Sequence, residues 1–342
     1  MNMEFIRKLP IPKDIKEMYP ISDELKQIKE KRDTEIRSVF EGTSSKFVLI
    51  IGPCSADRKE TVLKYISLLK PVADDVKDKL LIIPRVYTNK PRSSGIGYMG
   101  MLHQPDPIEM PDLLKGLLSI RELHLSILRD YGFTCADELL YPDNYRYLSD
   151  LLSYVAIGAR SVENQYHRLV ASGLDIPVGM KNPISGDLSV MYNSINAARH
   201  SHAFLYRGWE VVTHGNSLVH GVLRGYKDIN GHNQPNCSYD YLCSVLRFFE
   251  REEIYKSNLI IDTNHSNSNK DYSRQIEIAL DVMQSRKKNF DLRAMIKGLM
   301  IESYLKDGSQ SEKCTEEGLS ITDPCLGWDK TKDLIYRIAD AI

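Results

Sequence analysis

Residues 80–94 read LLIIPRVYTNKPRSS, an apolar run that ends in positive charge and hydroxyl groups. Leu80–Ile83 has the pattern of a short strand buried on both faces, as in a parallel sheet. The residues that follow supply three cations, a stiff turn and two hydroxyls: Arg85, Lys90, Pro91, Arg92, Ser93 and Ser94. Several cations and hydroxyls beside a buried strand suit a phosphate, or a phosphate beside a carboxylate. A solvated basic loop is the alternative interpretation of such a cluster.

Apolar runs alternate with helix-period segments from Lys46 onward, which indicates a parallel sheet. Eight strands without a separating linker favour a closed α/β barrel, (β/α)₈, over an open doubly wound sheet. The predicted strands are Phe47–Ile51, Leu80–Val86, Phe133–Asp137, Val155–Ala159, Pro177–Lys181, Ala203–Arg207, Leu259–Asp262 and Gly298–Glu302. The predicted domains are an N-terminal extension at 1–45, with a charged helix near Ser22–Phe40, and a catalytic barrel at 46–342. Two short apolar pieces, Glu210–Thr213 and Val219–Leu223, predict a long loop with an extra hairpin after the sixth strand.

Composition excludes several classes of protein. The chain has 342 residues and a formal net charge of −1, so no large basic field suggests nucleic acid, and the reader motifs for nucleic acid are absent. No apolar stretch approaches the length of a bilayer span, and the charged, proline-broken N-terminus lacks the apolar core of a signal peptide. Its 6 cysteines contain no CxxC pair, which argues against a zinc ribbon or a disulfide scaffold. We therefore expect a soluble cytoplasmic protein.

Chemistry in a barrel gathers at the C-terminal ends of the strands. The polar residues that look least like surface filler occupy those positions after seven of the eight predicted strands. In chain order they are Cys54, Arg85–Ser94, Glu138, Arg160, Lys181, His265 and Glu302. Core packing does not readily explain so many reactive groups on one rim.

Two kinds of site can be built from these residues. Thiolate, imidazole and two carboxylates would suit Mn²⁺, Fe²⁺, Co²⁺ or Zn²⁺, and the candidate ligands are Cys54, His265, Glu302 and Asp323. Taken alone, Cys54 fits a buried structural thiol better, and His265 could equally be a hydrogen-bonded loop residue. The rim cations carry more charge than one monoanion needs, which favours two phosphorylated substrates, although each could pair with a carboxylate: Arg85, Lys90, Arg160, Lys181 and Arg224. Glu138 could transfer a proton or act as a counter-charge.

Eight separated motifs, in order and spacing, resemble the class I 3-deoxy-D-arabino-heptulosonate 7-phosphate (DAHP) synthases of bacteria and fungi. They are IGPCS (51–55), RVYTNKPRSSGIGYMGM (85–101), AIGARSVENQYHRLVASGL (156–174), PVGMKN (177–182), LRG (223–225), IIDTNHSNSNK (260–270), MIESYLKDGSQ (300–310) and GLSITDPCLGW (318–328). The resemblance implies a barrel transferase that condenses phosphoenolpyruvate with erythrose 4-phosphate and water, releasing DAHP and phosphate. That reaction is the first step of the shikimate pathway to chorismate and the aromatic amino acids.

The resemblance also implies roles for individual residues. One divalent metal ion would be held by Cys54, His265, Glu302 and Asp323. Phosphoenolpyruvate would bind Arg85, Lys90, Gly158, Ala159, Arg160, Lys181 and Arg224, close to Glu138. Erythrose 4-phosphate would bind Pro91, Arg92, Ser93 and Ser94, with Asp323 near the sugar. The implied catalytic residues are Cys54 and His265 on the metal, Lys90 protonating the developing alkoxide, and Glu138 activating or orienting the water.

Three departures from the family pattern stand out, and none of them removes a proposed ligand. Cys135-Ala136-Asp137 stands where the family has small residues before the strand-three glutamate. Asp175 stands where inhibitor-sensitive members have serine, and a carboxylate there would repel the carboxylate of an amino acid effector. The first residues also lack the acidic start usual in the family. We therefore expect feedback inhibition by Phe, Tyr or Trp to be weak or absent.

Three further expectations concern alternatives and assembly. A relative that uses another aldose phosphate is the nearest alternative enzyme, although Lys90–Ser94 (KPRSS) favours the four-carbon substrate. A non-catalytic regulatory homologue is the alternative from a different class, and the intact ligand and phosphate-binding sets argue against it. The resemblance and the N-terminal extension together predict a homo-oligomer, either a dimer or a tetramer.

Overall fold

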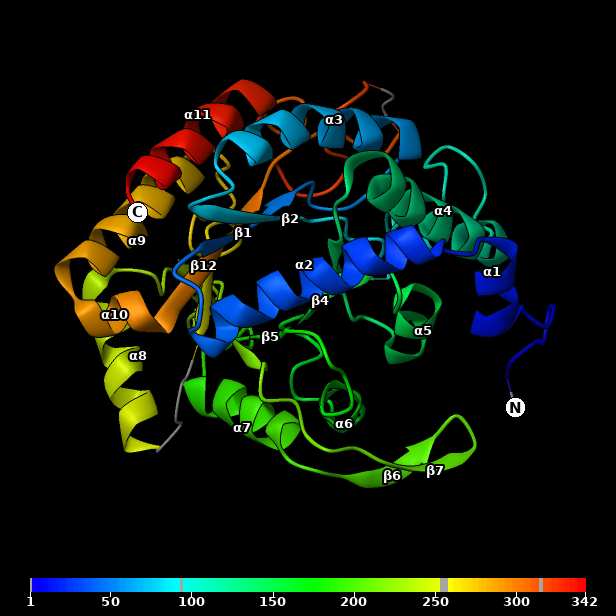
Figure 1. The fold of residues 1–342 in the computed structure, drawn as a ribbon, viewed down its shortest axis with the longest axis horizontal. Helices are drawn as coiled ribbons and strands as arrows, with labels where there is room; N and C mark the ends of the chain where they lie inside the picture. Colours follow the sequence, from blue (N-terminus) through cyan, green and yellow to red (C-terminus); the bar gives the residue numbers. More distant parts are fainter. Residues whose placement is uncertain (1, 93–94, 253–257, 314–315) are drawn as a thin grey trace.

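The computed structural model describes residues 2–92, 95–252, 258–313 and 316–342, and its centre is a barrel of parallel strands (Figure 1). The barrel strands are β1 (Phe47–Gly52), β2 (Leu80–Pro84), β3 (Cys135–Glu138), β4 (Leu152–Ile157), β5 (Val178–Lys181), β8 (His220–Leu223), β11 (Leu259–Asp262) and β12 (Ile296–Glu302). They pair in that order, and β12 returns to β1. Between β2 and β3 the ring is completed by Val86 N–H, which donates to Ala136 O at 2.9 Å. The predicted (β/α)₈ barrel is confirmed.

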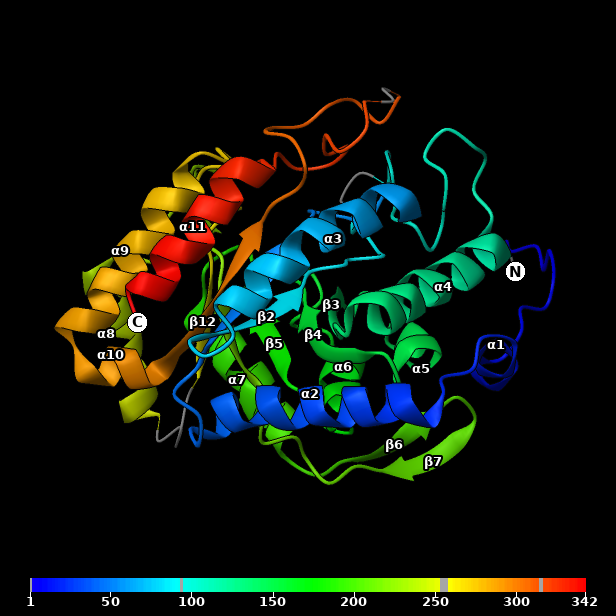
Figure 2. The ribbon, with the colours of Figure 1, turned by 45° about the horizontal axis from the view of Figure 1, so that its top comes forward.

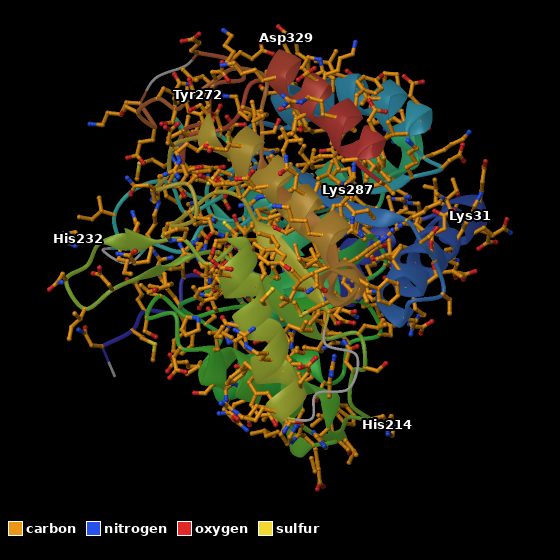
Figure 3. All side chains as sticks on the ribbon, turned by 90° about the vertical axis from the view of Figure 1, so that its left-hand side faces the viewer. Lys31, His214, His232, Tyr272, Lys287 and Asp329 are labelled. Carbon is orange, nitrogen blue, oxygen red and sulfur yellow. The ribbon has the colours of Figure 1, made fainter. Side chains whose placement is uncertain are left out.

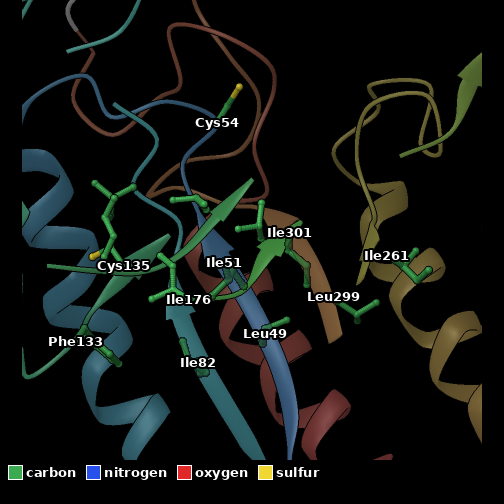
Figure 4. Close-up of a cluster of buried hydrophobic side chains, with 14 of the residues drawn as sticks. Leu49, Ile51, Cys54, Ile82, Phe133, Cys135, Ile176, Ile261, Leu299 and Ile301 are labelled. Atoms are coloured by element: carbon green, nitrogen blue, oxygen red, sulfur yellow. The ribbon is translucent and has the colours of Figure 1, made fainter. Parts of the chain in front are cut away.

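Helices surround the strands (Figure 2). The outward-facing strand side chains are buried beneath them. The helices are α3 (Lys59–Asp75), α4 (Leu113–Tyr131), η1 (Pro142–Asn144), α5 (Tyr145–Leu148), α6 (Gln165–Ala171), α7 (Leu188–Arg199), α8 (Tyr239–Arg251), α9 (Arg274–Lys288), α10 (Phe290–Met295) and α11 (Trp328–Asp340). Figure 4 shows the apolar side chains between the two layers, such as Leu49, Ile51 and Ile82. No helix in the described ranges is long and apolar enough to cross a membrane.

The N-terminal segment closes the end of the barrel where the strands begin. After α1 (Pro12–Met18), α2 (Asp23–Glu41) starts at Ser22, whose hydroxyl accepts from Leu25 N–H, and it crosses the barrel (Figure 1). Its apolar face, Ile36, Val39 and Phe40, is buried together with inward-facing strand residues such as Val48 and Ile50. The helix predicted near Ser22–Phe40 is therefore confirmed.

The predicted sixth strand was wrong, and so was the position of the hairpin. Ala203–Arg207 does not enter the barrel, because β6 (Ala203–Tyr206) pairs antiparallel with β7 (Trp209–Val212) on the outside. The sixth barrel strand is β8, which lies within Val219–Leu223, the second piece predicted for the hairpin, whereas the first piece, Glu210–Thr213, overlaps β7. Every residue of β8 is buried between β5 and β11, whereas β6 and β7 are exposed along most of their length. Arg207 and Gly208 join β6 to β7 with φ of 53° and 83°, the positive values that a two-residue hairpin turn requires.

A second small hairpin stands at the other end of the barrel, directly after β8. It pairs β9 (Tyr226–Lys227) with β10 (Asn233–Gln234) and projects outward, with His232 near its tip (Figure 3). Because it follows the C-terminal end of a barrel strand, it extends the wall of the barrel mouth.

Candidate active site

A cavity of about 370 Å³ opens at the C-terminal ends of the barrel strands. Most of the residues predicted to form the site line it: Cys54, Arg85, Lys90, Pro91, Arg92, Glu138, Gly158, Ala159, Arg160, Lys181, Arg224, His265 and Asp323. Glu302 is completely buried and pairs with the cavity residue Arg85. Ser93 and Ser94 lie outside the described residues. The topology of the barrel therefore brings segments far apart in the chain to one mouth.

Three of the four candidate metal ligands lie together. The Cys54 thiol and the carboxylates of Glu302 and Asp323 offer ligand atoms within 4.8 Å of one another. Cys54 follows the end of β1, and its sulfur points away from the apolar cluster below it (Figure 4). Glu302 ends β12; its Oε2 accepts from Asn264, and its buried Oε1 lies 2.8 Å from Arg85 Nη2. A thiol and two carboxylates form a donor set that fits a divalent transition metal or zinc.

His265, the fourth candidate ligand, lies at the edge of this group. Its backbone is left-handed, with φ of 51°, and its Nδ1 lies 2.9 Å from Asp262 Oδ2. Its Nε2 lies 3.8 Å from Glu302 Oε1, so the ring faces that carboxylate oxygen. A carboxylate on one ring nitrogen commonly orients the other toward a metal ion. The orientation of His265 fits such a role, although its nitrogens lie outside the three-residue group.

Lys90 provides a positive charge within the metal-ligand group. Its Nζ lies 2.8 Å from Cys54 Sγ and 2.8 Å from Asp323 Oδ2. Burial acts to lower the pKa of Lys90, but Cys54 and the carboxylates of Asp323 and Glu302 outweigh it and raise the pKa above its usual value. Burial, with Glu302 beside it, raises the pKa of Cys54 to about 11. Lys90 is therefore held as an ammonium, whereas Cys54 stays a thiol at neutral pH even beside Lys90 and needs a further cation, such as a metal ion, to persist as a thiolate.

Arg85 is a buried cation with part of its donor capacity unused. Its side chain is only 2% exposed, its Nη2 lies 2.8 Å from Glu302 Oε1, and its guanidinium carbon lies 3.9 Å from the centre of the Tyr87 ring. Nε and Nη2 also donate to the backbone carbonyls of Pro53 and Cys54. Nη1 has no hydrogen-bond partner among the described atoms. Leaving a buried guanidinium N–H unpaired is costly, so this group suits an anionic ligand.

Two more cations, Lys181 and Arg224, line the same cavity, and each is held by a hydrogen bond to a neighbouring residue. Lys181 Nζ, at the end of β5, lies 3.1 Å from Asp262 Oδ2. Arg224 follows β8; its backbone N–H donates to Asn182 Oδ1 at 2.9 Å, which fixes the start of the loop. Burial lowers the pKa of Arg224, partly offset by Asp262. Both cations are shielded from water in this cavity, and a bound anion would replace the hydration that they lose.

The Glu138 carboxylate lies close to the backbone at Gly158. A Cβ atom at residue 158 would lie 2.3 Å from Glu138 Oε1, closer than atoms can approach. Glu138 ends β3 and Gly158 follows β4, so the two neighbouring strands place a carboxylate directly beside the Gly158-Ala159-Arg160 segment.

Several cavity residues were not predicted from the sequence. Lys270 Nζ lies 2.8 Å from Asp323 Oδ1, so two lysines bind the two oxygens of one carboxylate. Lys270 is the last residue of the motif at 260–270, and its place in that motif could have drawn attention to it. Lys227 and Asn233 enter the cavity from the β9–β10 hairpin, which no sequence signal linked to the site. Asp262 was also missed, although it pairs with both Lys181 and His265.

The fold and the site define a barrel enzyme with a cation-rich cavity at the C-terminal ends of its strands. Residues 19–335 match the profile of the DAHP synthetase I family. The Tyr-sensitive phospho-2-dehydro-3-deoxyheptonate aldolase of Escherichia coli K12 is 36% identical over 96% of this chain and 92% of its own. The Phe-sensitive enzyme of that strain is 33% identical over 100% and 97%. A solved structure of the Francisella tularensis SCHU S4 aldolase has a TM-score of 0.92 and 30% identity, covering 100% of this chain and 98% of its own.

The chain belongs to the DAHP synthetase I family. It is a transferase that condenses phosphoenolpyruvate with erythrose 4-phosphate to give DAHP, in the shikimate route to the aromatic amino acids, as predicted. The alternatives, a non-catalytic homologue or a synthase for another aldose phosphate, are not favoured. Enzymes of this family use a divalent metal ion, and Cys54, Glu302 and Asp323 offer a possible site for it.

Proposed function

We propose that the cavity holds both substrates side by side, with Lys90 at the junction. Besides Lys90, phosphoenolpyruvate binds the deeper cations and the segment after β4: Arg85, Gly158, Ala159, Arg160, Lys181 and Arg224. Erythrose 4-phosphate binds the loop after β2, with Asp323 near the sugar: Pro91, Arg92, Ser93 and Ser94. The observation that carries this proposal is that Lys90 Nζ reaches both Cys54 and Asp323 while lining the same cavity as Arg85. Residues 46–342 are the catalytic barrel in this proposal, and residues 1–45 are an accessory extension.

The chemistry follows from the charges around the two substrates. Cys54, His265, Glu302 and Asp323 would hold a divalent ion, which would supply Lewis acidity for the aldehyde oxygen of erythrose 4-phosphate. As the enol carbon of phosphoenolpyruvate attacks the aldehyde carbon, Lys90 donates a proton to the developing alkoxide. Water adds at C2 of the former phosphoenolpyruvate unit, and Glu138 orients it and accepts its proton. The C–O bond to phosphate then breaks, the proton of the C2 hydroxyl passes to the departing phosphate as the ketone forms, and the cavity arginines and lysines hold that phosphate.

The dependence of the reaction on a divalent metal ion can be tested directly. We expect EDTA treatment to abolish phosphoenolpyruvate consumption in the presence of erythrose 4-phosphate, and Mn²⁺, Fe²⁺, Co²⁺ or Zn²⁺ to restore it, because thiolate, imidazole and carboxylate ligands accept each of these ions. Arabinose 5-phosphate serves as the matched control aldehyde and should support little turnover. Undiminished consumption by protein shown to be metal-free by mass spectrometry would contradict the proposed metal site.

Feedback inhibition is proposed to be weak or absent. Asp175 is exposed after α6, and its backbone carbonyl accepts from Arg37 Nη2 of α2 at 2.6 Å. We expect Phe, Tyr and Trp, each tested up to millimolar concentration in a steady-state assay, to leave turnover nearly unchanged, since the Asp175 carboxylate repels an effector carboxylate. Asp175→Ser should increase sensitivity to one of them. Submillimolar inhibition of the unmodified enzyme would contradict this prediction.

Self-association is proposed to use the β6–β7 hairpin, in a cytoplasmic homo-oligomer. An isolated two-stranded hairpin is marginally stable in water, yet this one exposes Leu205, Trp209 and Val212 to 73%, 74% and 61%. We expect the double change Leu205→Lys, Trp209→Lys to reduce the mass measured by light scattering to that of one chain. Phe290→Lys is the control, because Phe290 is 80% exposed at the start of α10. An unchanged mass for the double variant would locate the interface elsewhere.

A further inference from the structure

Asp137 is a carboxylate in an unusual position, on the outward face of the barrel beneath α4. Successive strand residues point to opposite faces, so Ala136 and Glu138 face the barrel interior while Cys135 and Asp137 face the surrounding helices. That outer face is otherwise packed with apolar side chains such as Ile120 and Leu139. Asp137 is only 4% exposed, and its neighbours in the sequence do not indicate which residue it would pair with. A buried carboxylate at such a place requires compensating contacts.

The compensating contacts tie together the two segments that carry Lys90 and Glu138. Asp137 Oδ1 accepts from Thr88 N at 2.8 Å and from Glu138 N at 2.7 Å, and Oδ2 accepts from Thr88 Oγ1 at 2.5 Å. Thr88 is completely buried two residues before Lys90, and Glu138 is the next residue of β3. One carboxylate thus fixes the path of the chain leaving β2 and the backbone at the end of β3.

No positively charged side chain pairs with Asp137 in the described part of the chain. The basic side chain that faces it is His124 of α4, whose Nε2 lies 3.9 Å from Asp137 Oδ2 and which is itself almost completely buried. Burial, with Arg121 nearby, lowers the pKa of His124 to about 3, so the imidazole is neutral. Burial also raises the pKa of Asp137 to about 7, opposed by the hydrogen bonds from Thr88 and raised further by the neighbouring Glu138 charge. The three donors, not a salt bridge, hold this carboxyl group in place.

We propose that Asp137 is a positioning residue for the condensation, which holds Lys90 and Glu138 in register across the mouth of the barrel. This inference rests on the proposed roles of Lys90 and Glu138. Its contacts reach the reaction only through those two residues, because Asp137 does not line the cavity. The phosphoenolpyruvate cations Arg85, Lys181 and Arg224 have their own supports, from Glu302, Asp262 and Asn182. Loss of Asp137 should therefore impair turnover more than phosphoenolpyruvate binding.

Two substitutions at residue 137 separate the contacts from the charge. Asp137→Ala removes all three hydrogen bonds, and we expect kcat to fall by about 100-fold, the scale of a misplaced catalytic group, with KM for phosphoenolpyruvate nearly unchanged. Asp137→Asn keeps an oxygen for both backbone N–H groups and offers Thr88 Oγ1 a donor, so most of the turnover should be retained. Equal losses in the two variants would overturn the positioning role, since Asn preserves the contacts.

Two controls keep the test independent of folding and of the proposed function. Asp150 lies just before β4, at the end of the barrel opposite the cavity, and its carboxylate accepts from the buried Arg121 at 2.7 Å. Asp150→Ala removes that partner, so it should lower thermal stability but not kcat. If Asp137→Ala fails to fold, Thr88→Val removes the hydroxyl contact with Asp137, together with a longer bond of 3.3 Å from Asn89 Nδ2, and should still lower kcat several-fold. Wild-type kcat in Asp137→Ala and Thr88→Val, beside an inactive Lys90→Met, would overturn this inference alone. An active Lys90→Met would instead refute the proposed function.

Discussion

Replacing Lys90 with Met is expected to lower kcat by about 1,000-fold or more while leaving the content of bound metal intact. Positioned general acids contribute roughly 10²–10⁴-fold to rate, and Lys90 is also the cation that would lie between two anionic substrates. Its ammonium contacts Cys54 Sγ and Asp323 Oδ2, both at 2.8 Å, and these two contacts hold it beside the candidate metal ligands. Met preserves the length and apolar character of the side chain, so the barrel should remain folded. Phosphate release and metal content, measured on the same preparation, check both expectations.

Lys270→Met is the matched control for this prediction. Lys270 also donates to Asp323 at 2.8 Å, but to the other carboxylate oxygen, and its side chain is 56% exposed. An exposed ion pair contributes little, so we expect a loss much smaller than that of Lys90→Met. Equal losses in the two variants would mean that the charge on Asp323, and not proton donation by Lys90, limits the reaction.

Replacing Cys54 with Ala is expected to abolish metal-dependent turnover without unfolding the protein. The thiol is one of three ligand groups whose atoms lie within 4.8 Å of one another, and the loss of a ligand weakens metal affinity steeply. Its removal from a fully buried site should cost only about 1 kcal/mol of stability, because Cys and Ala differ by one atom. Metal content by mass spectrometry, thermal melting and turnover across a metal titration would measure the three effects separately.

Cys237→Ala controls for the loss of a buried thiol as such. Cys237 is 8% exposed and belongs to no group of candidate metal ligands in the described residues. It should retain both metal and activity. Full activity of Cys54→Ala in the presence of EDTA would refute the assignment of Cys54 as a ligand.

The barrel was predictable because its strands carry strong local signals. Runs such as Phe47–Ile51 are apolar throughout, and the reactive residues follow them at the same end. The sixth strand was not predictable in the same way, because Ala203–Tyr206 and His220–Leu223 are similar short apolar runs. What separates them is whether a strand has partners on both edges, which depends on the rest of the sheet. The Arg207-Gly208 turn between two apolar pieces is the local feature that marks these pieces as a hairpin instead of a barrel strand.

The site was predictable at the level of residue types and less so at the level of contacts. Family motifs named Cys54, Lys90 and Glu302, but nothing in them says that Lys90 binds the thiol directly or that His265 stands at the edge of the ligand group. The roles of these residues stay predictions. Asp137 stood out in the sequence only as a departure from small residues. Its bond to Thr88 joins positions 49 residues apart, a distance that local pattern does not reveal.

The helix across the lower end of the barrel has a consequence for how this enzyme can be engineered. Ile36, Val39 and Phe40 of α2 fill the space that the barrel strands leave at their starts, and Asn258 donates to Phe40 O at 2.7 Å. The barrel is therefore a vessel with one mouth, and its floor is supplied by a segment that precedes its first strand. A shortened chain that begins at Phe47 would lose that floor and admit water to the interior. Fusion partners should be attached ahead of α2, and truncated versions of the enzyme should keep it.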